Sequence, residues 1–112
     1  MPETLTVRGN DDIRIVDVNG DLLNLSALSL RKELKSLLCQ GIYKLIVNLS
    51  KVGYFSTPSV GVLVAISAQV RQKGGYFKVC GLTDRIKRTF DLVGASKVLE
   101  IYDSEADAIV SF

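Results

Sequence analysis

The sequence predicts an α/β domain, a small mixed β-sheet with about four helices. The first observation is order, because short apolar strands alternate with helical patterns after an opening pair of strands. The second is length, since 112 residues are enough for one domain to bury a core without disulfides. The third is composition: a hydrophobic fraction of 47% is typical of a folded chain. We therefore expect residues 1–112 to form a single domain.

Two alternating segments open the chain. Residues 4–7 and, for most of their length, residues 13–18 place an apolar side chain at every second position. The Asn-Asp-Asp run of residues 10–12 predicts a turn between them. These segments should form an antiparallel pair with one buried face.

The apolar spacing then changes to that of a helix, from about Ser26 to Gln40. Asn24 or Ser26 can cap its start, and Gly41 is expected to end it. One face carries four leucines: Leu30, Leu34, Leu37 and Leu38. The near-continuous apolar run of residues 43–49 then predicts a central strand.

Four hydroxyl and proline residues, Ser56-Thr57-Pro58-Ser59, separate that strand from the next helix. Proline has a helical φ and no N–H to lose, so Pro58 fits the first helical position. Thr57 would then be the N-cap, its Oγ accepting a hydrogen bond from a first-turn amide. The same position favours an added phosphate, because the helix dipole and free N–H groups attract anions. Thr57 therefore has two interpretations, a helix cap and a phosphorylated switch.

The helix of residues 58–73 is apolar on nearly all sides and is followed by Gly74-Gly75. Its β-branched residues alone would favour a strand, but its length, the proline and the glycines favour a helix. Such a helix either buries two sides or keeps one side for a partner. Two buried sides are hard to arrange in so small a domain, so we favour a partner.

The C-terminal third continues the alternation. Residues 76–80 predict a strand, and Thr83 or Asp84 can cap the following helix, which Gly94 ends. Its expected buried face is Ile86, Phe90 and Val93. Residues 98–102 predict a short strand, and residues 104–107 open a last short helix with an approximate capping box.

Composition argues against several classes of function. There is no histidine, which removes the commonest general base and metal ligand, and no metal or cofactor site is indicated. Cys39 and Cys80 are isolated from each other, so two buried, reduced thiols are expected. The net charge of +2 is too small for a nucleic-acid or membrane surface, and we expect Arg85, Lys87 and Arg88 to form a solvated helix face.

Targeting signals are also lacking in the residues given. The longest apolar run, residues 60–66, is too short to span a bilayer. The N-terminal residues lack the basic and apolar regions of a signal peptide. A cytoplasmic protein without membrane insertion is the default expectation.

Several segments together resemble the STAS domain of bacterial anti-sigma factor antagonists. They are residues 46–55, the hydroxyl corner, and residues 60–64, 72–75, 79–81, 86–94 and 101–108. The pattern Lys87-Arg88-x-Phe90-Asp91-x-x-Gly94 is quite specific. The resemblance implies a small mixed sheet carrying helices, and binding rather than catalysis. It implies an antagonist that captures an anti-sigma factor, also a serine/threonine kinase, in a partner-switching system of transcription regulation.

The resemblance also places the contact surface. It implies phosphorylation at Thr57, which would add about −1.5 to −2 charges within that surface. The expected partner-binding residues are Ser56, Thr57, Pro58, Ser59, Val60, Val62, Leu63, Leu23 and Asn24. The family pattern at the corner is Asp-Ser-Ser-Gly, so Ser56 and Ser59 replace an acid and a glycine. Leu23 replaces a second acid, whereas the apolar helix is intact.

Three alternatives remain open. The chain resembles STAS subunits that dock on the ATPase of lipid-transport ABC systems, where no phosphorylation is needed. An enzyme would need a base for Ser56, Thr57 or Ser59, and Lys51, expected to face solvent, is the only one nearby. The apolar helix face could instead pair two copies of the chain as a homodimer.

Overall fold

The computed structural model describes residues 5–9, 12–20 and 24–112, with the side chains of residues 24–26 outside the description. The elements in chain order are β1 (Leu5–Arg8), β2 (Ile13–Val18), α1 (Asn24–Cys39), β3 (Lys44–Asn48), α2 (Thr57–Gln72), β4 (Tyr76–Cys80), α3 (Asp84–Leu92), a 3₁₀ turn η1 (Ala95–Lys97), β5 (Glu100–Tyr102) and α4 (Glu105–Val110). Within these ranges, no helix is long and apolar enough to cross a membrane.

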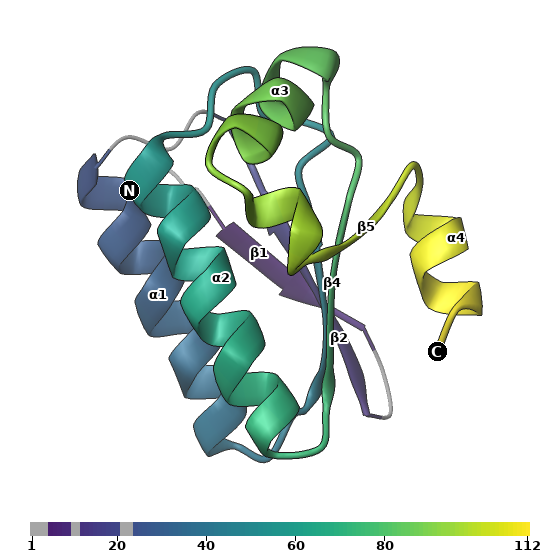
Figure 1. The fold of residues 1–112 in the computed structure, drawn as a ribbon. Helices are drawn as coiled ribbons and strands as arrows, with labels where there is room; N and C mark the ends of the chain where they lie inside the picture. Colours follow the sequence, from purple (N-terminus) through teal and green to yellow (C-terminus); the bar gives the residue numbers. More distant parts are fainter. Residues whose placement is uncertain (1–4, 10–11, 21–23) are drawn as a thin grey trace.

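The strands form one mixed sheet in the order β1-β2-β3-β4-β5 (Figure 1). β1 and β2 are antiparallel, and every later pair is parallel. The parallel pairs require crossover helices, which α1, α2 and α3 provide. The predicted mixed sheet, opening antiparallel pair and central strand are confirmed, whereas the turn predicted at residues 10–12 falls largely outside the described residues.

Helices α1 and α2 lie side by side on one face of the sheet, and α4 lies on the other (Figure 1). The main core fills the space beneath α1 and α2, and the predicted leucine face of α1 is buried there. The smaller cluster beneath α4 contains Ile15, Ile46, Cys80 and Ala108. An exposed ion pair network also holds α4: the Arg8 guanidinium binds both Asp17 and Glu105, and the Asn48 amide donates to Glu105 at 3.0 Å.

The apolar residues of α2 are buried more completely than expected from the sequence. Val60, Leu63, Ile66 and Val70 are each 0–1% exposed, because α2 packs between the sheet, α1 and the η1 segment. Its exposed strip consists mainly of small residues, which do not need deep burial. The helix therefore buries two sides even in so small a domain, because strand β4 and helix α1 flank it.

Two other expectations need correction. Cys39 is exposed rather than buried, since it lies on the outer side of the last turn of α1, whereas Cys80 is buried in the sheet. Val93 is 47% exposed because α3 ends before it, leaving Ile86 and Phe90 as the buried face. Lys51, Arg85, Lys87 and Arg88 face solvent as predicted.

Candidate functional site

The corner between β3 and α2 is anchored from both sides. Asn48 Oδ1 accepts a hydrogen bond from the Ser50 amide at 2.9 Å, which fixes the turn after β3. Phe55 is 2% exposed and its ring lies 6.1 Å from that of Phe90 on α3. The corner is therefore held by apolar packing of Phe55 on one side and by the Asn48–Ser50 hydrogen bond on the other.

The N-cap of α2 is Ser56, not Thr57 as the sequence predicted. Ser56 has extended backbone angles, φ −71° and ψ 155°, and its Oγ accepts a hydrogen bond from the Ser59 amide at 3.2 Å. The two hydroxyl oxygens of Ser56 and Ser59 lie 2.8 Å apart. Pro58 is therefore the second helical residue, where a missing N–H still costs no helical hydrogen bond.

This shift by one residue separates two roles that the sequence assigned to Thr57. Ser56 is 4% exposed and Ser59 is 0% exposed, so the capping hydroxyls face inward. Thr57 and Pro58 are exposed on the first turn of α2. The Thr57 hydroxyl does not cap α2, because the Ser56 hydroxyl accepts the capping hydrogen bond from the Ser59 amide.

The other expected contact residues fall into three groups. Val62 of α2 is half-buried and packs against the edge of the main core. Val60 and Leu63 are 1% and 0% exposed, with their side chains in the main core. Leu23 lies outside the described residues. Asn24 is the first residue of α1, and the side chains of Asn24 and Ser26 are not described.

Charges are sparse at the corner. Lys51 is the only charged side chain between residues 48 and 63, and it is exposed. No carboxylate from this segment is present to orient or deprotonate the Thr57 hydroxyl. The described residues also contain no cluster of three or more His, Cys, Asp or Glu arranged to hold a metal ion.

A hollow beside the corner was not predicted from the sequence. Arg31 of α1 lines it together with Pro58, Gly61 and Ala65 of α2, and its volume is about 360 Å³. The sequence showed Arg31 only as one of several polar residues of α1. The spacing of Arg31 and Lys35 places both on one side of the helix, but only the packing of α1 against α2 shows what that side faces.

The model of the STAS domain family matches residues 4–108. This chain belongs to the STAS domain family. The Anti-sigma-B factor antagonist of Bacillus subtilis is 32% identical over 101 residues, which cover 90% of this chain and 92% of that protein. A crystal structure from Thermotoga maritima matches with a TM-score of 0.89 at 25% identity, over 96% of this chain and 92% of that one. The crystal structure of an anti-sigma factor antagonist from Mycobacterium paratuberculosis shares the fold, with a TM-score of 0.87 at 22% identity over 96% and 92% of the two chains.

Membership in the STAS family confirms the resemblance drawn from the sequence, and the fold agrees with it. It also gives the corner substitutions a structural meaning. The sequence resemblance matched Ser56 to the acid of the family pattern, and in the structure its neutral hydroxyl caps α2. It matched Ser59 to the glycine, and the Ser59 hydroxyl lies 2.8 Å from that of Ser56 in the interior. The two substitutions therefore act as a buried pair, and Thr57 keeps the exposed hydroxyl.

Proposed function

We propose that this STAS protein is a cytoplasmic anti-sigma factor antagonist. In this role it binds an anti-sigma factor that is also a serine/threonine kinase, and phosphorylation of Thr57 reverses the binding. The support is the similarity to proteins named as antagonists across nearly the whole chain, at up to 32% identity. The chain acts by binding, and the corner provides no oriented base for an enzyme.

One observation carries the assignment of Thr57. Of the three hydroxyls at the corner, those of Ser56 and Ser59 are buried and bound to each other, and that of Thr57 is exposed. A kinase needs a hydroxyl that reaches its active site without unfolding the substrate. Thr57 meets that requirement, and its modification would leave the cap intact.

The proposed contact surface is the exposed strip at the start of α2. Thr57, Pro58 and Val62 provide it directly, and the sequence adds Leu23 and Asn24 to it. Val60 and Leu63 would contribute indirectly, because their burial in the core fixes the orientation of the first turn of α2. A phosphate there would add about −1.5 to −2 charges to this surface. The free N–H groups of the helix start would stabilise the phosphate, so the fold would tolerate a modification that the partner would not.

The test is a kinase assay and a pull-down with the cognate anti-sigma factor. We expect mass spectrometry to find one phosphate, on Thr57, and none on Thr57→Ala. Thr57→Glu should lose binding, whereas Thr57→Ala should bind like the unmodified chain. Ser36→Glu is the matched control, since Ser36 is an exposed hydroxyl on α1 away from the corner.

Other results would contradict the proposal. If both Thr57 variants bind like the wild type and no phosphate appears, Thr57 is not a switch. If the chain co-purifies with an ABC-transporter ATPase and not with a kinase-like anti-sigma factor, the antagonist role is wrong. A concentration series in light scattering will show whether two copies pair through α2.

A further inference from the structure

A shallow groove runs along the surface between α1 and α2. The hollow beside the corner, about 360 Å³, continues past Gln69 into a second hollow of about 260 Å³ that reaches Lys35 and Lys73. A third hollow of about 480 Å³ lies on the outer side of α1. It shares Arg31 with the first hollow and Lys35 with the second. The groove therefore begins at Pro58 and extends to the far end of both helices.

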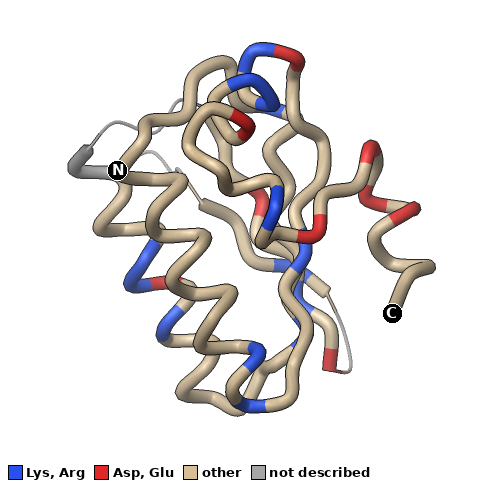
Figure 2. The backbone as a smooth tube through the Cα atoms, viewed as in Figure 1, with Lys and Arg blue, Asp and Glu red and all other residues tan. Residues whose placement is uncertain are grey.

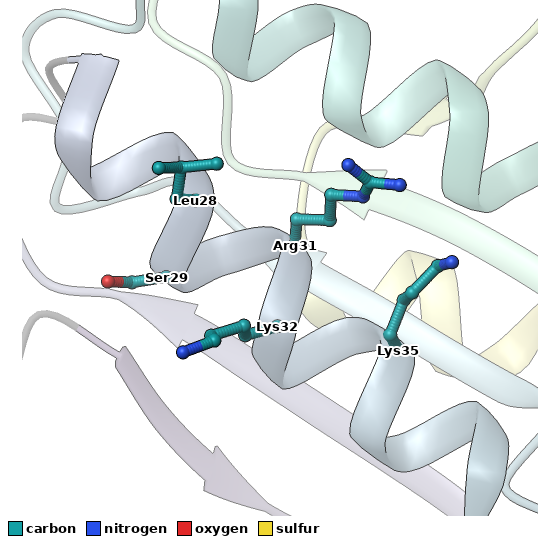
Figure 3. A pocket seen from close by; sticks show the side chains of 5 residues that line it. All are labelled: Leu28, Ser29, Arg31, Lys32 and Lys35. Carbon is teal, nitrogen blue, oxygen red and sulfur yellow. The ribbon is translucent and has the colours of Figure 1, made fainter.

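The rim of this groove is basic. Figure 3 shows Arg31 and Lys35 extending from the same side of α1, one turn apart. Lys73 lies beyond the end of α2, and its ammonium group is 6.0 Å from the centre of the Tyr43 ring. Figure 2 shows basic residues along α1 and near the lower end of α2.

The described lining of the groove holds basic side chains and no acidic ones. The salt bridges found among the described residues involve Arg8, Lys44, Lys78 and Lys87, and none involves a cation of the rim. Arg31, Lys35 and Lys73 are exposed, so their charges are available to a bound molecule.

The apolar lining of the groove combines the small residues Gly61 and Ala65 with the buried side chains of Leu38 and Ile66. Gly61 and Ala65 lie one turn apart on α2, and both are exposed. A Cβ added at Gly61 would have no atom within 4 Å. Small residues let another backbone approach closely, and Arg31 and Lys35 on α1, with Lys73 past the end of α2, would then reach acidic side chains on it.

We propose that this groove binds an acidic amphipathic helix of the anti-sigma factor. The proposal rests on the proposed function for the identity of the partner, and on the groove for its chemistry. Helices α1 and α2 have 16 residues each. A helix of about 16 residues is about 24 Å long, which matches the groove. Its apolar face would contact Gly61 and Ala65, with acidic residues toward Arg31, Lys35 and Lys73.

The shape favours a helix over an anionic membrane surface. A protein that binds a bilayer presents protruding apolar side chains below its cations. In this groove the apolar side chains of Leu38 and Ile66 are buried, whereas the cations Arg31 and Lys35 are exposed. An elongated segment fits such a recess, and a flat bilayer does not reach its floor.

The position of the groove also gives the switch a physical basis. Pro58 lines the end of the groove beside Arg31, and Thr57 is its neighbour in the chain. A phosphate on Thr57 would add negative charge at this end and attract the Arg31 guanidinium. It would therefore weaken the binding of an acidic segment without changing the fold.

The direct test is titration of the ¹⁵N-labelled chain with a synthetic helical peptide of Glu, Ala and Leu, about 16 residues long. We expect amide shifts at Gly61, Ala65 and Gln69, and binding that weakens as salt is raised. Arg31→Glu with Lys35→Glu should weaken binding at least about tenfold, and Gly61→Leu should block the floor. Arg88→Glu, an exposed cation of α3, is the matched control and should leave binding unchanged.

Each other outcome overturns the inference. A peptide with Gln in place of Glu that binds equally well would rule out charge recognition. Shifts elsewhere, or no shifts, would rule out the groove, and binding only to phosphatidylcholine–phosphatidylglycerol vesicles would indicate a lipid surface. If the double variant binds the anti-sigma factor as well as wild type does, the groove inference fails and the proposed function stands. If wild type binds no anti-sigma factor at all, the proposed function fails.

Discussion

Replacing Ser56 by alanine tests the assignment of the helix cap. Ser56 is 4% exposed, its Oγ accepts a hydrogen bond from the Ser59 amide at 3.2 Å, and it lies 2.8 Å from Ser59 Oγ. Loss of an N-cap costs about 1 kcal/mol of unfolding free energy. The Ser59 hydroxyl would then be buried without a partner, which adds about 1–3 kcal/mol. Ser56→Ala should therefore destabilise the chain by about 2–4 kcal/mol and lower Tm by on the order of 10 °C.

Urea unfolding followed by circular dichroism measures this effect, with Thr57→Ala as the control. Thr57 is exposed and makes no cap, so its replacement should change the unfolding free energy by no more than about 0.5 kcal/mol. The double variant Ser56→Ala, Ser59→Ala should cost less than the sum of its single changes, because both members of the buried pair are removed. The reasoning is refuted if Thr57→Ala is the more destabilising single change.

Three further predictions follow from other parts of the fold. Gly75→Ala should destabilise the chain by about 1–3 kcal/mol in urea, because the added Cβ would collide with a backbone carbonyl; a neutral result would contradict this. Hydrogen bonding to Arg8 holds the pKa of Glu105 below its usual range. The ionised Glu105 carboxylate therefore contributes to the free energy of unfolding near neutral pH, and this contribution is lost as pH falls through the folded-state pKa. The free energy of unfolding, measured from pH 7 to about 3, should therefore fall less in Glu105→Gln than in wild type. An equal fall in both proteins would contradict a stabilising role of the Arg8–Glu105 ion pair. Iodoacetamide should modify Cys39 alone in the folded chain, because burial raises the pKa of the Cys80 thiol to about 11, and mass spectrometry should show a second adduct only after unfolding.

The order and type of the elements were predictable because their patterns are local. The leucine spacing of α1 and the apolar run of β3 each depend on a single element, and both are confirmed. The Ser104 cap of α4 is likewise local, and its Oγ accepts a hydrogen bond from the Asp107 amide at 3.1 Å. These local patterns predict the structure correctly because each depends on the geometry of a single element.

The predictions that failed depended on tertiary packing. Four adjacent residues could all cap or begin α2, and the folded chain buries Ser56 as the cap and leaves Thr57 exposed. Exposure of Cys39 depends on which side of α1 faces the sheet at its last turn. The groove is a product of two helices far apart in the sequence, so no single segment could have predicted it.

The most direct measurement of the central claim is the affinity of the cognate anti-sigma factor for the chain before and after phosphorylation, by isothermal titration calorimetry. We expect tight binding of the unmodified chain and of Thr57→Ala, and loss of binding when Thr57 carries a phosphate. Equal affinity of the phosphorylated and unmodified chains would contradict it.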